Sequence, residues 1–375
     1  MQRISFYIFR QLMIALIFAA AAVSFVVLFT QSFRLLSLVI DNSSTLWIFL
    51  ELMLLAVPTF MPLVLPLSVG LATIFIYNKL AVDSELVIMR AAGMSPMRLA
   101  LPAILVGTIV MVACYMCTLY LTPAANRAMV AVQYEVRNNY AVFLSRPGNF
   151  NDITAGLTFY AQKRNGQALE GILIHDVRIP KAPITLMAKT GQVIEKDGGP
   201  QIVVFNGKRQ EMDVTTGRLN ELAFDQYVLD LNALRSAESS RLPDPREQTA
   251  FELLNPSDDM LKMRASRERL IAELHQRLAS PLLALSFTLI GLAAMLFGQF
   301  SRRGMGKRIV LGAAIIIAVE ASFMSMNGII AKHYWMAFAL YFIPLIPIPI
   351  ALAFINSEYL RARTSPSEQP VPLTS

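Results

Sequence analysis

The hydrophobic positions of this chain fall into six long runs, three on each side of a central polar stretch. The runs extend from Phe9 to Phe29 with a weak continuation to Ile40, Leu46 to Tyr77, Leu99 to Leu121, Leu278 to Phe300, Ile309 to Ala331, and Trp335 to Ile355. Each run has the ~20 residues that an α-helix needs to cross a bilayer. The first run is also longer than the roughly 7–15 apolar residues of a signal peptide, so we expect an uncleaved span. The pattern predicts a membrane α-helical protein with six transmembrane helices in a 3+3 arrangement.

The central stretch, which begins near Pro123, has the pattern of an inserted all-β domain. Segments rich in β-branched and aromatic residues alternate with turn signals such as Asn165-Gly166, Asn206-Gly207 and Thr216-Gly217. The expected strands run from Leu157 to Gln162, Gly171 to Arg178, Gln201 to Phe205, Lys208 to Val214 and Ala223 to Leu231. Strands at this spacing, with no helical pattern between them, predict an antiparallel sandwich or jelly roll.

The same pattern sets the expected domain boundaries. The first three helices, with a short cytoplasmic helix at about 82–93, occupy residues 1–122, and the β domain with its linker occupies 123–265. The linker is expected at Pro243-Asp244-Pro245, after which Asn255 is expected to cap a charged helix that runs to the membrane. The last three helices occupy residues 266–356, and 357–375 is expected to be a disordered cytoplasmic tail rich in Pro and Ser.

The distribution of Lys and Arg among the short loops predicts the orientation in the membrane. The opposite side holds only Arg34 and Lys332 in its short loops, and the β insert is too long to count. We therefore expect both termini in the cytoplasm and the β domain on the outer side. The cytoplasmic side then holds Arg3, Arg10, Lys79, Arg90, Arg98, Arg302, Arg303, Lys307, Arg308, Arg361 and Arg363.

Composition agrees with a membrane protein and offers little for catalysis. The 375 residues are 55% hydrophobic and 16% charged, with a mean hydropathy of +0.51, whereas soluble domains carry about 25% charged residues. The net charge of +7 lies largely in the loops that set orientation, which argues against a nucleic-acid partner. Cys114 and Cys117 lie in an apolar run and favour packing between helices over redox chemistry. With no metal-ligand spacing and no complete phosphate loop, we expect no cofactor on this chain and no enzymatic activity.

One polar segment between the second and third runs, Lys79 to Arg98, predicts a short helix at the inner face. Its middle carries good helix formers, with acidic residues at the start and basic residues at the end. Asp83 or Ser84 is expected to cap its beginning, and Gly93 to stop it. Such a helix can dock into a partner and transmit force. The alternative is an ordinary loop between two spans.

A few residues inside the apolar runs are candidates for handling a substrate. Pro58, Pro62 and Pro66 lie near one face of the second span and predict bending, either as a lateral gate or as a simple kink. Glu320 is either a partner in interhelical hydrogen bonds or part of a substrate path or gate. Arg34 either binds a phosphorylated lipid headgroup or extends to the membrane interface.

With these motifs together, the chain resembles the LptF/LptG (YjgP/YjgQ) permease family of the lipopolysaccharide-export ABC transporter of Gram-negative bacteria. The resemblance lies in the segment Asp83 to Ser95, in the Pro-rich run from Val57 to Leu67, and in the sequence from Glu273 to Pro281 that enters the fourth span. The 3+β+3 layout and the length also match. The end of the first span and the entry to the fourth resemble the LptF type more closely.

The resemblance implies a permease subunit of the bacterial inner membrane, with a periplasmic β-jelly roll that passes lipopolysaccharide towards the outer membrane. It implies these partners: a homologous LptG-type permease, two cytoplasmic LptB-type ATPases that hold ATP and Mg, and LptC/LptA-type bridge proteins. It also implies a coupling helix whose acidic residue, Glu85, docks into the ATPase, together with Asp83, Ser84, Met89, Arg90 and Gly93.

Two other functions are compatible with the sequence. One is a membrane-embedded enzyme acting on lipid-linked sugars, for which Glu51 is a candidate acid without a visible partner. The other is a secondary transporter centred on Glu320. Retention of an ATPase on purification discriminates both from a transporter subunit.

Overall fold

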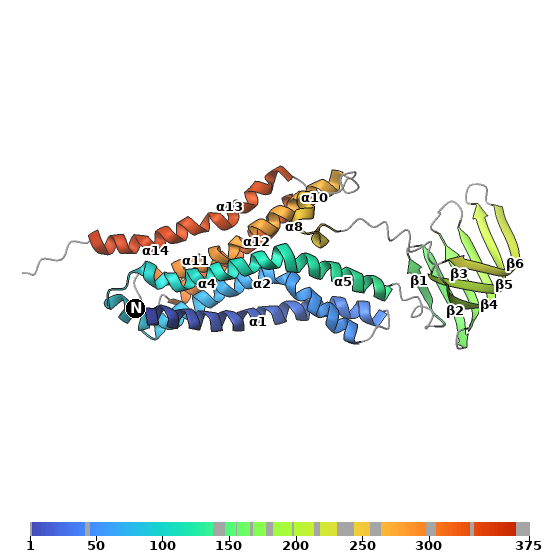
Figure 1. The fold of residues 1–375 in the computed structure, drawn as a ribbon, viewed down its shortest axis with the longest axis horizontal. Helices are drawn as coiled ribbons and strands as arrows, with labels where there is room; N and C mark the ends of the chain where they lie inside the picture. The colour runs from blue at the N-terminus through green and yellow to red at the C-terminus, as the bar shows by residue number, and fades with distance from the viewer. Residues whose placement is uncertain are drawn as a thin grey trace, which may run out of the picture. The chain divides into compact units, whose positions relative to one another are not determined.

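The computed structural model describes residues 2–41, 46–137, 147–154, 156–165, 168–177, 183–196, 199–213, 218–230, 244–255, 264–297, 305–330 and 334–364. The chain divides into two compact units, and each is described by itself (Figure 1). One unit is helical and comprises Met1–Leu35, Leu50–Met129 and Pro243–Ser375. The other comprises Leu36–Phe49 and Val130–Leu242 and contains the β-sheet.

The helices before the sheet follow the predicted apolar runs and the predicted short helix, except that α5 lies beyond the third run, in the stretch expected to belong to the β domain. They are α1 (Gln2–Asp41), α2 (Leu46–Val82), the short α3 (Glu85–Ala91), α4 (Pro96–Met116), a π-helical turn η1 (Cys117–Leu121) and α5 (Thr122–Arg137). Figure 1 shows α5 continuing the direction of α4. The π turn therefore inserts a local irregularity without ending the helix.

The helices after the sheet are shorter and more often broken. They are η2 (Pro245–Glu247), α8 (Ala250–Leu254), α10 (Arg264–Ala279), α11 (Leu282–Leu296), α12 (Met305–Ile330), η3 (Tyr334–Phe338), α13 (Ala339–Leu345) and α14 (Pro347–Thr364). In the described part of the chain, five helices are long and apolar enough to cross a membrane, and a pair bent by 42°, Glu268–Ala279 with Leu282–Leu296, makes a sixth candidate. The predicted helical membrane fold is confirmed.

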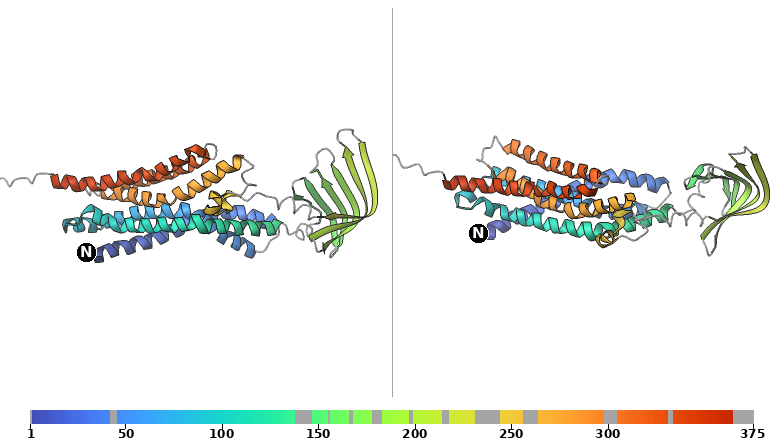
Figure 2. Two further views of the ribbon diagram at one scale, coloured as in Figure 1. Left: turned by 45° about the horizontal axis from the view of Figure 1, so that its top comes forward. Right: turned by 90° about the horizontal axis from the view of Figure 1, so that it is seen from above.

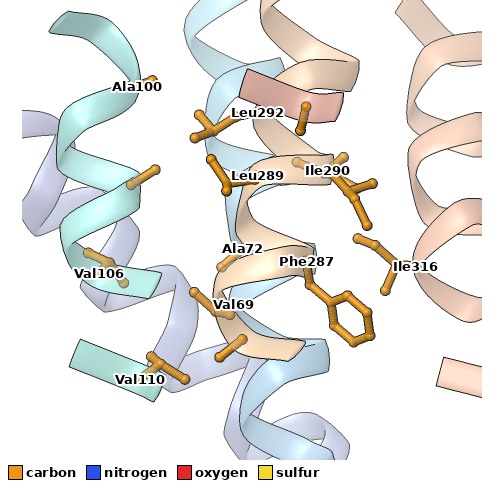
Figure 3. Packing of buried hydrophobic residues seen from close by; sticks show 14 of the residues in the cluster. Val69, Ala72, Ala100, Val106, Val110, Phe287, Leu289, Ile290, Leu292 and Ile316 are labelled. Carbon is orange, nitrogen blue, oxygen red and sulfur yellow. The ribbon is translucent and has the colours of Figure 1, made fainter. Parts of the chain in front are cut away.

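Helix α11 lies at the centre of the helical unit. Figure 3 shows its side chains Phe287, Leu289 and Leu292 between the residues of α2, α4 and α12. Close approach is required at Gly107 of α4, because a Cβ built there would lie 2.6 Å from the Thr288 hydroxyl oxygen. Small residues at such positions let transmembrane helices pack with their backbones near each other.

The β domain is a single antiparallel sheet in the described residues. Its strands are β1 (Phe150–Thr154), β2 (Leu157–Asn165), β3 (Ala168–Asp176), β4 (Ile184–Lys196), β5 (Gly199–Asp213) and β6 (Arg218–Asp230), paired in consecutive order. Figure 2 shows this sheet strongly curved, with its concave side open. The inserted β domain is confirmed, and its described strands form one curved meander rather than the two facing sheets of a sandwich.

Several strand boundaries differ from the prediction. The sequence pattern missed β1 and β4, and it placed a turn at Asn206-Gly207 where the structure has one continuous strand, β5. Asn206 has φ of 54°, yet the register of β5 with β4 and with β6 is the same on both sides of this residue. The Asn-Gly pair therefore adopts the left-handed conformation of a hairpin turn inside a strand whose pairing continues without a register shift.

The segment where the chain re-enters the helical unit contains two short capped helices at and after the expected linker. Asp244 and Glu247 form a capping box on η2, and Thr249 and Glu252 form a second one on α8. Asn255 is the C-terminal cap of α8, and the residues after it, where the expected charged helix would begin, lie outside the described residues until Arg264. Residues 365–375 of the expected tail lie outside the described residues.

Candidate functional site

The short helix α3 follows almost directly from α2. Asp83 N–H donates to Lys79 O at 2.9 Å, and the backbone then reverses at Ser84, which has φ of 62°. Ser84 occupies the N-cap position, but its side chain makes no capping hydrogen bond. The prediction of a side-chain cap at Ser84 is therefore wrong, because the left-handed backbone replaces the extended conformation that a capping side chain needs.

The end of α3 has the predicted glycine. Gly93 has φ of +84°, its N–H donates to Arg90 O at 2.9 Å, and Met94 N–H donates to Met89 O at 3.2 Å. These two bonds form a Schellman motif, in which glycine avoids the strain of the left-handed conformation. Met94 is buried, as the motif's apolar contact requires. A seven-residue helix is therefore fixed at its C-terminal end.

Helix α3 has one buried face and one exposed apolar face. Leu86 is fully buried in the helical core, whereas Val87 and Ile88 are 44% and 66% exposed. Asp83 and Ser84 are exposed beside them, and Glu85 and Met89 are partly exposed. The helix therefore presents an apolar pair next to acidic and polar groups, while Leu86 holds it to the bundle.

Polar contacts fix α3 to helices far apart in the sequence. Arg90 Nη2 donates to Leu296 O at 2.6 Å, at the end of α11, and the Tyr7 hydroxyl of α1 donates to Glu85 Oε1 at 3.2 Å. Arg308 of α12 donates to the next carbonyl, Phe297 O, at 2.7 Å. The last carbonyls of a helix have no partner within it, and a cation there is favoured by the helix dipole. Helix α3 is thus joined to both halves of the helical unit.

The three prolines lie within one continuous helix, α2. Pro62 has no N–H to donate to Pro58 O, and the Thr122 hydroxyl of α5 donates to that oxygen at 3.0 Å instead. The neighbouring Thr59 hydroxyl donates to Asn126 Oδ1 at 3.2 Å. The part of α2 from Pro58 to Pro66, which we call the proline segment, is therefore joined to α5 by two side-chain hydrogen bonds. The choice between a gate and a simple kink stays a prediction.

The remaining membrane candidates do not join this cluster. Glu320 of α12 is partly buried, and its Oε2 has no hydrogen-bond partner in the described part of the chain. Arg34 belongs to α1, but its side chain lies outside the described residues. Glu51, the candidate acid of the alternative enzyme, is exposed on α2.

Sequence reasoning missed the polar residues that bring distant helices together. The chief examples are Thr118, Thr122, Asn126, Arg127 and Arg277, each of which bonds to a backbone carbonyl of another element. The one available signal was the spacing of Thr118, Thr122 and Asn126 by four residues, which places them on one helix face. Their partners are backbone atoms and carry no mark in the sequence.

Comparison with known proteins gives a consistent match along nearly the whole chain. The family described as lipopolysaccharide export system permease LptF/LptG matches residues 6–357. An uncharacterised protein of Rickettsia prowazekii is 29% identical over 350 residues, which cover 92% of this chain and 96% of the relative. The lipopolysaccharide export system permease protein LptF of Escherichia coli K12 is 25% identical over 177 residues, which cover 46% of this chain and 48% of that protein.

Proposed function

Because the chain belongs to the LptF/LptG family of lipopolysaccharide export system permeases, we propose that it is a transport subunit driven by a separate ATPase. In this proposal it takes lipopolysaccharide from the inner membrane and passes it to a periplasmic bridge towards the outer membrane. The partners are a homologous LptG-type permease, two LptB-type ATPases and LptC/LptA-type bridge proteins. The match to LptF of Escherichia coli supports assignment to the LptF type.

The observation that carries the proposal is the way α3 is held. Val87 and Ile88 are exposed, while Leu86, Arg90 and Glu85 fix the helix to the bundle. An amphipathic helix whose apolar residues lack a cover is suited to a groove in another protein. Because α3 is joined to α1, α2 and α11, a force applied to it reaches several spans at once.

The excess of Lys and Arg in the short loops supports an orientation with α3 in the cytoplasm and the β-sheet in the periplasm. The ATPases would then meet α3 directly and bind ATP and Mg. The curved sheet would meet the acyl chains, since buried side chains such as Leu157, Phe159 and Ile174 give it an apolar lining. Buried residues alternate with partly buried ones from Leu157 to Ala161 of β2, which supports one apolar side.

Within the membrane, we assign Arg34, the proline segment of α2 and Glu320 to lipid binding and gating. In this proposal Arg34, near the expected outer end of the first span, holds a phosphorylated headgroup by paired hydrogen bonds. Arg34→Ala should weaken photocrosslinking to lipopolysaccharide more than Arg34→Lys does. Equal labelling of the two variants would remove Arg34 from the lipid site.

The proposed function is tested by purification of the tagged chain and by charge reversal on α3. Wild-type protein should retain an ATPase, and Glu85→Arg should lose most of it and most export, because the acidic contact becomes repulsive. Asp225→Arg, at an exposed acid of β6, is the matched control and should retain the ATPase. If no ATPase is ever retained and Glu85→Arg exports normally, the chain is not a subunit of this kind.

A further inference from the structure

Two helices in which a proline leaves a backbone carbonyl without its helical partner, α2 and α10, contact the helix formed by α4, η1 and α5, and hydroxyl groups of that helix bond to both carbonyls. Pro281 has no N–H for Arg277 O, and the Thr118 hydroxyl lies 3.3 Å from that oxygen and from Tyr115 O of its own helix, so its one proton is shared between the two. Thr122, four residues later, donates to Pro58 O. One face of this helix therefore carries donors for the carbonyls that prolines leave unpaired in α10 and α2.

Asn126, four residues further along the same face, joins α2 to a different element. Its side-chain Oδ1 accepts from the Thr59 hydroxyl at 3.2 Å, and its Nδ2 donates to Arg246 O at 3.3 Å. Arg246 lies in the segment from Asp244 to Asn255, which we call the strap. The last strand, β6, ends at Asp230. The strap is the first described segment of the helical unit after that strand.

Two arginines hold the strap against the helical unit from different helices. Arg127 of α5 donates through Nε to Glu247 O and pairs with the carboxylate of Glu252. Arg277 of α10 is 3% exposed, and it donates to Gln248 O at 2.6 Å and to Pro245 O at 3.0 Å. Glu273 pairs with the Arg277 Nε atom at 2.9 Å, so the buried charge is compensated.

The strap is also ordered by its own sequence. Each of its two short helices has a capping box, in which the capping side chain and an acidic residue three positions later exchange hydrogen bonds with the backbone. A segment so capped, with five of its residues bonded to α5 and α10, moves with those helices rather than independently of them. The strap is therefore held in a fixed position against α5 and α10.

We propose that Asn126 is a positioning residue that links the proline segment of α2 to the strap, so that a movement of α2 is passed to the chain leaving the β-sheet. Helix α2 runs without a break from Pro58 to Val82 and continues through hydrogen bonds into α3. A displacement of α3 is therefore carried along α2 to Thr59 and Pro58. This inference rests on the proposed function for the origin of the displacement, but the link itself is a property of the chain.

The link is tested by hydrogen exchange of the full chain, purified with the proteins it retains. Asn126→Asp keeps the acceptor for Thr59 and removes the donor to Arg246 O. Without nucleotide, exchange in residues 244–255 should rise roughly three- to tenfold, as expected for loss of one hydrogen bond. Thr122→Val, which touches α2 and not the strap, should also raise exchange in the strap. The matched control is Thr108→Val, whose hydroxyl bonds only to Ile104 O of its own helix.

A second measurement tests whether a movement of α2 reaches the strap. ATP should change exchange of the strap in the wild-type assembly, and Asn126→Asp should abolish that change while ATP hydrolysis continues. Unchanged strap exchange in both Asn126→Asp and Thr122→Val, or a full response to ATP in Asn126→Asp, would overturn the proposal. Failure of the proposed function is recognised separately, as absence of an ATPase from the preparation, and the nucleotide-free comparison still decides whether the link exists.

Discussion

Arg90 and Leu296 lie 206 positions apart in the sequence, yet the Arg90 guanidinium donates to the Leu296 carbonyl at 2.6 Å. Leu296 is the last residue of α11, and the chain turns to an extended conformation at Phe297. The Leu296 carbonyl therefore lacks a helical partner, and Arg90 supplies one from α3. This bond makes the central helix of the bundle a direct neighbour of the proposed ATPase contact.

Replacement of Arg90 should therefore affect both stability and transport. Arg90→Met keeps the aliphatic stem but removes the donor to Leu296 O, and we expect the free energy of unfolding to fall by about 1–2 kcal/mol. Export should fall further than ATPase retention, because Val87 and Ile88 remain exposed. Thermal unfolding and an export assay check this, with Lys307→Met, an exposed cation on α12, as the control. Equal export by the two variants would contradict the role of this bond.

The exposed side chain of Ile88 should matter for assembly and not for folding. Ile88→Ser removes apolar surface that is 66% exposed, so the melting temperature should stay close to wild type. Loss of an apolar contact at an interface should lower ATPase retention at least tenfold. Leu254→Ser, at a 64% exposed leucine of α8, should retain the ATPase as wild type does. Normal retention by Ile88→Ser would place the docking surface elsewhere.

Glu320→Gln distinguishes a hydrogen-bonding side chain from a charged one. The amide keeps the shape and the hydrogen-bonding capacity of the carboxyl group, so we expect export within about twofold of wild type if Glu320 acts between helices. Ser325→Ala is a suitable control, because the Ser325 hydroxyl bonds to Ala321 O of its own helix. A loss of export specific to Glu320→Gln would favour the charged role and the secondary-transporter alternative.

The strap should loosen in acid. The hydrogen bond from the Thr249 backbone lowers the pKa of Glu252, and the neighbouring Arg127 lowers it further. A carboxyl whose pKa is lower in the folded state contributes stability above its unfolded pKa, and this contribution is lost as pH falls through the folded value. We expect the melting-temperature difference between wild type and Glu252→Gln to be full at pH 7 and to shrink below about pH 4. A melting-temperature difference that stays constant over this pH range would contradict a stabilising role of the ionised Glu252 carboxylate.

The sequence by itself determined the membrane class, the two sets of spans and the inserted β domain. Runs of apolar residues at bilayer length have one stable solution in lipid, because helices satisfy their backbone hydrogen bonds internally. Gly93 was also predictable, since the Schellman end needs a residue that adopts positive φ without strain. Features of this kind depend only on residues close together in the chain, so the sequence alone predicts them.

Only the tertiary structure decided how polar residues are shared among helices. Asn206-Gly207 lies within a strand and not at a turn because β4 and β6 both pair with β5 on either side of it. The region around Asp244 is a capped strap because Arg127 and Arg277 hold its carbonyls. The carbonyls that Pro62 and Pro281 leave unpaired need donors from elsewhere, and any nearby hydroxyl on a neighbouring helix serves. Which hydroxyl does so depends on how helices pack, and that information is not contained in local sequence.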